Sequence, residues 1–177
     1  MKMPHNPLRD KIDRLLESWQ KKGLPSRQGL VEAAERLTQW KKEERITGLW
    51  PSPLTMITAT IDDGWGHGLD IIHRYAKVAG VSIHPLGLLC SPEEIVEACK
   101  ARRPDILGLT VLQFFSDDDL IHISANLPKK TRIIAGGPVF NADPDFAACT
   151  GVHHVAKNVA AFLELLLCWP PEDNINI

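Results

Sequence analysis

The stretch that decides the fold is LTMITATIDDGWGHGLDIIHRYAKVAG, residues 54–80. Its first part, residues 54–61, is a short apolar run rich in β-branched residues, which is typical of a buried strand. After the loop 62–68, apolar positions recur at helical spacing over residues 69–79, and Gly80 ends that helix. A strand, a glycine-rich loop and a helix in this order predict the first unit of a parallel sheet.

The sequence downstream repeats this alternation of strand and helix. Further strands are predicted over residues 81–86, 106–111, 132–135 and 153–155, with helices over residues 91–102, 116–126, 143–149 and 158–168. Because parallel strands need crossover connections, this pattern predicts an α/β protein with a five-stranded parallel sheet flanked by helices.

Upstream of this alternation the sequence predicts two amphipathic helices. One covers residues 7–21, and the other runs from an N-cap at Ser26 to near Gly48. Trp19 and Trp40 lie on their apolar stripes, where packing onto the sheet is the default interpretation. We expect a helical annex over residues 1–50, a main domain over residues 54–168 and a tail over residues 169–177, with the proline-containing segment between the first two as a linker.

The composition excludes several classes of function. A chain of 177 residues that is 44% apolar can bury one main core. Its 20 basic and 22 acidic residues are spread along the sequence, so nucleic acid and anionic membranes are not expected partners. No apolar run reaches the ~20 residues that cross a bilayer, and the start lacks a signal-peptide pattern, so we expect a cytoplasmic protein. The four scattered cysteines contain no C-x-x-C pair, which argues against a zinc knuckle or a disulfide framework.

The ends of the predicted strands hold the candidate site, because open parallel sheets bind ligands at their carboxyl edge. The loop 62–68 contains three glycines beside an acidic pair, and a tight surface turn is the alternative interpretation of this loop. The third strand ends at Thr110 and Leu112, and the fourth ends at Gly136-Gly137-Pro138. These groups predict a ligand that lies close to the backbone.

The spacing of these groups resembles that of a known family. Cobalamin-binding domains of methionine synthase, of corrinoid methyltransferase proteins and of cobalamin-dependent mutases carry Asp-x-His-x-x-Gly, then Ser or Thr-x-Leu, then Gly-Gly after strands one, three and four. Residues 54–168 contain, in order, Asp63 and Gly68 of the first motif, Thr110 and Leu112 of the second, and Gly136 and Gly137 of the third. The resemblance implies a flavodoxin-like fold, a cobalamin or related corrinoid with its cobalt, and a binding set of Asp63, Gly64, Trp65, Gly66, His67, Gly68, Thr110, Leu112, Gly136, Gly137 and Pro138.

The sequence departs from the family at the position of the family's histidine, which is the lower ligand of cobalt. Trp65 occupies this position, and an indole nitrogen donates a hydrogen bond but has no available lone pair. Trp65 would therefore cover the lower face of the corrinoid or leave cobalt without a protein ligand, which suits methyl transfer. His67 as a displaced cobalt ligand is the alternative, and otherwise no metal-binding residue is expected.

The resemblance implies a carrier rather than a catalyst. The sequence has no motif that pairs a nucleophile with a base, so we expect a methyl carrier that works with a methyltransferase or an activating protein. Two alternatives stay open: a sensor that binds cobalamin or haem and signals through the N-terminal helices, and an interaction domain without a ligand. Family members cover the upper face of the corrinoid with a four-helix unit. The two helices here would need a partner or a homodimer mate to complete such a cover.

Overall fold

A central parallel sheet organises the molecule. The computed structural model describes residues 6–62, 67–113 and 116–169. Within them the strands are parallel throughout and lie in the order β2-β1-β3-β4-β5. This sheet confirms the predicted five-stranded flavodoxin-like fold. The strands are β1 (Thr55–Thr60), β2 (Ser82–Gly87), β3 (Ile106–Thr110), β4 (Arg132–Gly136) and β5 (His154–Val155).

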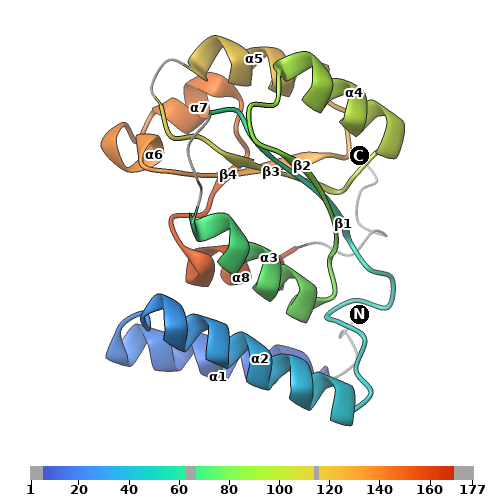
Figure 1. Cartoon of the computed structure of the whole chain (residues 1–177), viewed down its shortest axis with the longest axis vertical. Coiled ribbons are helices and arrows are strands. Elements are labelled where there is room, and N and C mark those ends of the chain that lie inside the picture. Colours follow the sequence, from blue (N-terminus) through green and yellow to red (C-terminus); the bar gives the residue numbers. More distant parts are fainter. Residues whose placement is uncertain (1–5, 63–66, 114–115, 170–177) are drawn as a thin grey trace.

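Helices cover both faces of the sheet, and the N-terminal helices add a further layer (Figure 1). One face carries α3 (His67–Ala79) and α8 (Val159–Leu167), and the other carries α4 (Pro92–Arg102) and α5 (Asp117–Asn126). Below α3 and α8 lie α1 (Pro7–Lys22) and α2 (Arg27–Glu43). Two short helices, α6 (Val139–Ala142) and α7 (Phe146–Thr150), follow β4.

The second helix is shorter than predicted, because α2 ends at Glu43 instead of near Gly48. Arg45 has a positive φ of 56°, a conformation that usually calls for glycine at the end of a helix. Its N–H donates to the carbonyl of Lys42 at 3.1 Å, and the N–H of Ile46 donates to that of Lys41 at 2.9 Å. These two bonds form a Schellman motif. Because an arginine occupies the usual glycine position, the sequence gives no sign of this ending.

The region after β4 also differs from the prediction, which placed one helix over residues 143–149. The structure has α6 and α7 in its place, separated by Asp143, whose φ of −128° and ψ of 100° are extended. The rings of Phe140 and Phe146 meet edge to face, with centroids 5.5 Å apart. This aromatic contact holds the two short helices together.

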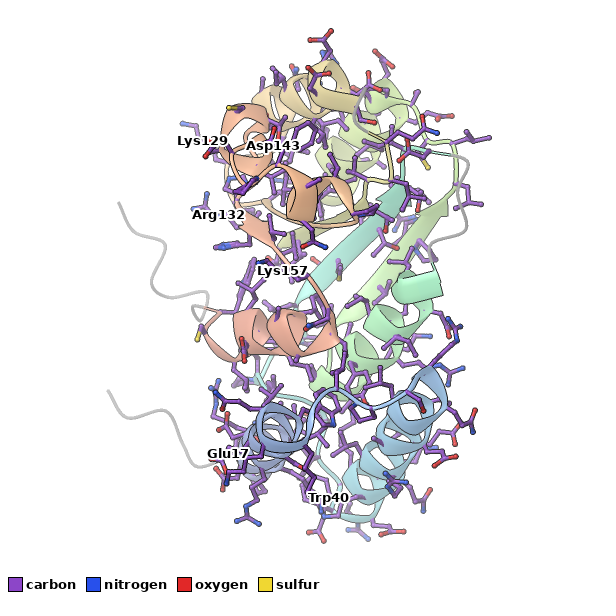
Figure 2. All side chains as sticks on the ribbon, turned by 90° about the vertical axis from the view of Figure 1, so that its left-hand side faces the viewer. Glu17, Trp40, Lys129, Arg132, Asp143 and Lys157 are labelled. Carbon is purple, nitrogen blue, oxygen red and sulfur yellow. The ribbon has the colours of Figure 1, made fainter. Side chains whose placement is uncertain are left out.

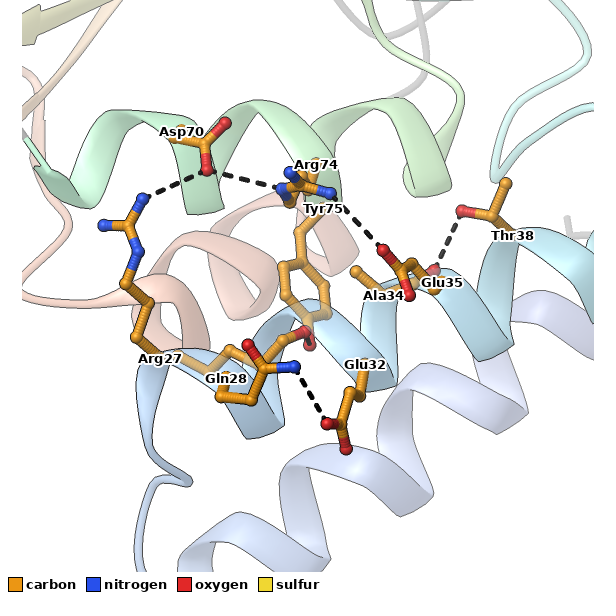
Figure 3. Close-up of polar contacts among 10 residues, drawn as sticks. Arg27, Gln28, Glu32, Ala34, Glu35, Thr38, Asp70, Arg74 and Tyr75 are labelled. Carbon is orange, nitrogen blue, oxygen red and sulfur yellow. Dashed lines mark hydrogen bonds and ion pairs between the residues drawn. The ribbon is translucent and has the colours of Figure 1, made fainter.

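The N-terminal helices share one hydrophobic core with α3, α8 and the sheet. Trp19 is 7% exposed and meets the ring of Tyr75 edge to face, with centroids 5.6 Å apart. The hydroxyl of Tyr75 donates to the carbonyl of Leu30 at 2.8 Å in a buried position. At the surface, Arg27 of α2 pairs with Asp70 of α3 at 3.3 Å (Figure 3). The packing interpretation of Trp19 is confirmed, and the helices are docked on α3 and α8.

Among the described residues, no helix is both long enough and apolar enough to cross a bilayer.

Candidate functional site

The sheet presents two different sets of side chains at its carboxyl edge. Side chains alternate between the faces of a strand. Ile57, Ala59, Leu107 and Leu109 pack in the core under α4 and α5. Their neighbours on the other face, toward α3 and α8, are small or polar, so the described strand residues place no large apolar side chain on the carboxyl half of that face. These neighbours are Thr58, Thr60, Gly108, Thr110 and Gly136.

A cavity of about 510 Å³ lies on that face. The sheet forms one wall, the start of α3 and the segment leading into α8 form two more, and the turn between α1 and α2 contributes to the lining. This volume falls within the ~300–1,000 Å³ that is usual for small-molecule sites. Its lining residues include Leu24, Leu30, Met56, Gly68, Leu69, Ile72, Gly108, Thr110, Leu112, Ile134, Gly136, Gly137, Pro138, Asn141, Lys157, Asn158 and Phe162.

Asp62 joins the loops that follow three strands. Its carboxylate accepts a hydrogen bond of 2.6 Å from the backbone N–H of Leu112, beyond the end of β3. Its own carbonyl accepts a bond of 3.3 Å from the N–H of Leu89, beyond the end of β2. Asp62 is only 8% exposed, so these bonds form largely away from water. The side chain therefore holds Leu112 at the edge of the cavity.

Two threonines on β1 extend toward the helices above the same face. The hydroxyl of Thr58 lies 2.9 Å from Nε2 of His73 on α3, and burial lowers the pKa of that histidine, with a further lowering by Lys77. The hydroxyl of Thr60 is fully buried and has no hydrogen-bond partner within the described part of the chain. A buried hydroxyl without a partner is costly, and such groups are concentrated at functional sites.

The three glycines of the site differ in whether the surrounding structure leaves room for a side chain. At Gly137, whose φ is 134°, a Cβ atom would collide with the carbonyl oxygen of Val111, so the fold itself requires glycine. At Gly136 a Cβ would lie 3.0 Å from the carbonyl oxygen of Ala156. A Cβ on Gly68 would meet no described residue within 4 Å. Of these three glycines, Gly68 is therefore the one at which the described residues leave room for a side chain.

The predicted binding residues divide into three groups. Gly68, Thr110, Leu112, Gly136, Gly137 and Pro138 all line the cavity. Asp63, Gly64, Trp65 and Gly66 lie outside the described residues, and so does the side chain of His67, although its backbone begins α3.

Sequence reasoning missed other residues of the site. Gly108 could have been found, because an isolated glycine within a strand often marks a close approach of another group. Asp62 is visible in the sequence only as half of an acidic pair, and the sequence does not predict its hydrogen bond to Leu112. Leu24 and Lys157 line the cavity from segments far away in the sequence, and no local pattern marks them.

The fold and the cavity define a class of protein: an α/β protein with a ligand site at the carboxyl edge of a parallel sheet, at the reversal of strand order between β1 and β3. The sequence matches the model of the B12 binding domain over residues 57–165. The chain belongs to this family of cobalamin-binding domains. A search of curated proteins gives no match.

Several solved structures have a similar fold. A cobalamin-binding protein from Desulfitobacterium hafniense DCB-2 has a TM-score of 0.74 and 19% identity, over 92% of this chain and 80% of that one. The methanol:cobalamin methyltransferase complex from Methanosarcina barkeri gives 0.62 and 16%, over 92% and 69%. The monomethylamine corrinoid protein of the same organism gives 0.54 and 18%, over 89% and 79%. The haem alternative finds no support in these comparisons.

The residues present fit the nucleotide tail that a cobalamin carries. Gly136 leaves the edge of the sheet wall without a side chain, Gly108 makes room for the side chain of Met56, and Thr110 brings a hydroxyl to the edge of the cavity. The hydroxyl of Thr60, which has no partner among the described residues, lies beside Thr110 in the register of β1 and β3. A mostly apolar cavity with a few polar groups at one end is the usual form of a cofactor site.

Proposed function

We propose that this chain is a corrinoid carrier, which binds cobalamin or a related corrinoid and presents its cobalt to a partner protein. The nucleotide tail would lie in the cavity between the sheet and helices α3 and α8. The observation that carries this proposal is that the six described residues of the predicted motifs line one cavity of about 510 Å³. A tight surface turn, the alternative interpretation of loop 62–68, would not need such a cavity behind it.

Three features of the chain would hold the tail. Gly68 leaves the start of α3 open, so that the tail can pass beside the helix. Thr110 offers a hydroxyl at the end of β3, and Asp62 fixes the loop that carries Leu112. Burial between the sheet and the helices excludes water from the bound base. Each feature positions the cofactor, and none of these residues acts as a nucleophile or a base.

The cobalt of a bound corrinoid can accept and release a methyl group, which is the chemistry we propose for this carrier. Trp65 supplies no lone pair, so the cobalt would have no protein ligand on its lower face. The competing proposal is that His67 is a displaced ligand. The visible spectrum of the loaded protein separates these two proposals, because the His67→Ala substitution changes the spectrum only if His67 is bound to cobalt.

A partner would supply the methyl donor and the methyl acceptor. One solved structure of similar fold is a methanol:cobalamin methyltransferase complex. By analogy, we propose that a methyltransferase or an activating protein contacts the carboxyl edge of the sheet. Pairing of two copies through the N-terminal helices stays a prediction.

The test is to load purified protein with hydroxocobalamin, desalt it and record the visible spectrum. We expect the wild type to retain about one corrinoid per chain. The Gly68→Leu variant should lose the corrinoid, because its side chain enters the open space at the start of α3. Ala101→Leu, which introduces the same side chain at an exposed position of α4, is the control and should retain it.

Thermal unfolding of each variant establishes that it is folded. A wild-type protein that is colourless after desalting would overturn the proposal. If a folded Gly68→Leu variant retains the corrinoid fully, the proposed placement of the nucleotide tail in the cavity is wrong.

A further inference from the structure

The inner end of the cavity is apolar. The strands run toward the carboxyl edge, so residues early in a strand lie farthest from the mouth. Met56 of β1 and Ile134 of β4 line this inner end, and Phe162 of α8 faces them from the helix layer. Their exposed fractions are only 2%, 3% and 1%. The backbone beside them is paired along the ladders of the sheet, so a polar group brought there would find no free partner among these residues.

The mouth of the cavity is polar. Thr110 ends β3, Asn141 lies in α6 and Lys157 immediately precedes the cap of α8. Figure 2 looks onto the carboxyl edge, and the labelled Lys157 lies near the centre of this face. Lys157 is exposed and supplies the positive charge among the described lining residues. The cavity thus changes from charged and polar at its mouth to apolar at its inner end.

The nucleotide tail of a corrinoid has the same order of polarity. Its phosphodiester is anionic and leads through the ribose to a planar base. An anion is stabilised near Lys157, and a planar apolar base gains from burial among Met56, Ile134 and Phe162. This match orients the tail with its base inside and its phosphate at the mouth.

The N-terminal helices complete the apolar lining. Leu24, in the turn between α1 and α2, lines the cavity although it is 43% exposed. Leu30, one turn into α2, lines it as well, and its carbonyl is held by the hydroxyl of Tyr75 on α3. The buried Tyr75 bond and the Arg27–Asp70 ion pair fix this turn against α3. The helical annex is therefore part of the cofactor site.

On the basis of the proposed function, we propose that this cavity selects corrinoids whose lower base is an apolar benzimidazole over corrinoids whose lower base is a purine. Leu24 is a specificity-determining contact for that base. Adenine carries an amino donor and several ring acceptors, and burying them beside aliphatic side chains removes their hydrogen bonds to water without replacement. A dimethylbenzimidazole has methyl groups at the corresponding edge and a single free ring acceptor, so it loses fewer hydrogen bonds to water by the same burial.

The experiment compares three corrinoids on the full chain by equilibrium dialysis: cobalamin, the analogue with adenine as lower base, and cobinamide, which lacks the nucleotide. We expect the adenine analogue to bind at least about tenfold more weakly than cobalamin, which corresponds to about 1.4 kcal/mol. Cobinamide should also bind more weakly than cobalamin.

The outcomes distinguish a failure of the selectivity from a failure of the proposed corrinoid binding. If the chain binds none of the three, the proposed function fails. Equal binding of cobalamin and the adenine analogue would overturn the selectivity and leave the carrier function intact. Equal binding of cobinamide and cobalamin would overturn the placement of the tail in the cavity, again without affecting corrinoid binding itself.

A pair of matched variants tests Leu24. Leu24→Asn places an amide donor and acceptor in the lining, and we expect the preference for cobalamin over the adenine analogue to fall toward unity. Ile121→Asn is the control, because Ile121 is 46% exposed on α5, on the opposite face of the sheet. An unchanged preference in Leu24→Asn would overturn the role of Leu24.

Discussion

The two faces of the sheet carry the same strands but serve different purposes. Under α4 and α5, alternate positions of β1, β3 and β4 hold aliphatic side chains along the whole strand, and the face is packed. Under α3 and α8, the alternate positions change from Met56, Ile106 and Ile134 to threonine and glycine toward the carboxyl edge. The first face stabilises the fold, and the second forgoes part of that stability to keep a cavity.

This difference shows that alternate residues of one strand can have separate roles, with one set packing the core and the other leaving room for a ligand. A strand such as ILGLT in β3 reads as a weak apolar run, yet its Leu107 and Leu109 belong to one face and its Gly108 and Thr110 to the other. Substitutions on the packed face should cost stability. Substitutions on the hollow face should cost binding.

The largest expected effect concerns a glycine that the fold requires. Gly137→Ala forces a Cβ against the carbonyl oxygen of Val111 at a φ of 134°, so we expect a loss of about 3 kcal/mol or more in the free energy of unfolding. Gly68→Ala is the matched control and should leave stability unchanged or raise it by about 0.5–1 kcal/mol. Urea denaturation measures both. A Gly137→Ala protein as stable as the wild type would contradict the close approach of Val111.

The second prediction compares the two faces directly. Leu107→Ala removes a fully buried side chain from the packed face and should cost about 2–5 kcal/mol. Met56→Ala removes a side chain of similar size that is also buried but borders the existing cavity, and we expect a smaller cost, below about 2 kcal/mol. Denaturation curves of the two variants decide this comparison. Equal losses would mean that the second face is packed as tightly as the first.

The sequence was sufficient for most of the fold and for part of the site. Helix starts could be predicted because their caps are local: Ser91 and Glu94 form a capping box at α4, and Asn158 accepts from the N–H of Ala161 at α8. The end of α2 could not be predicted, because Arg45 adopts a positive φ that its residue type does not suggest. Its conformation depends on the surrounding structure.

Residues of the site likewise divide into those that local sequence predicts and those that only tertiary packing brings in. Thr110 and Gly136 stand at strand ends, where topology alone predicts a ligand site. Leu24 enters the site only because α1 and α2 dock on α3 and α8, and that docking is set by long-range contacts such as Trp19 with Tyr75. Tertiary packing of this kind leaves no local pattern in the sequence.

The third prediction concerns the residue that joins the strand ends. Asp62→Ala leaves the N–H of Leu112 without its partner in a mostly buried position, and we expect a loss of about 1–3 kcal/mol in stability. Asp62→Asn keeps an oxygen acceptor and should lose less. The two variants should also release hydroxocobalamin faster than the wild type, in the same order. If Asp62→Ala is as stable as the wild type and retains the corrinoid equally, the hydrogen bond to Leu112 has no role in the site.

The smallest expected effect concerns Lys157, the charge at the mouth of the cavity. An exposed lysine that pairs with a phosphate contributes only ~0.2–1 kcal/mol, since water and salt screen the interaction, so Lys157→Ala should weaken cobalamin binding by about 1.4-fold to fivefold. The loss should shrink at high ionic strength, and stability should not change. Cobinamide lacks the phosphodiester of the tail, so its binding should be insensitive to the substitution. This contrast between two corrinoids distinguishes a contact at the mouth from a general effect of charge, because a general effect would alter both affinities alike.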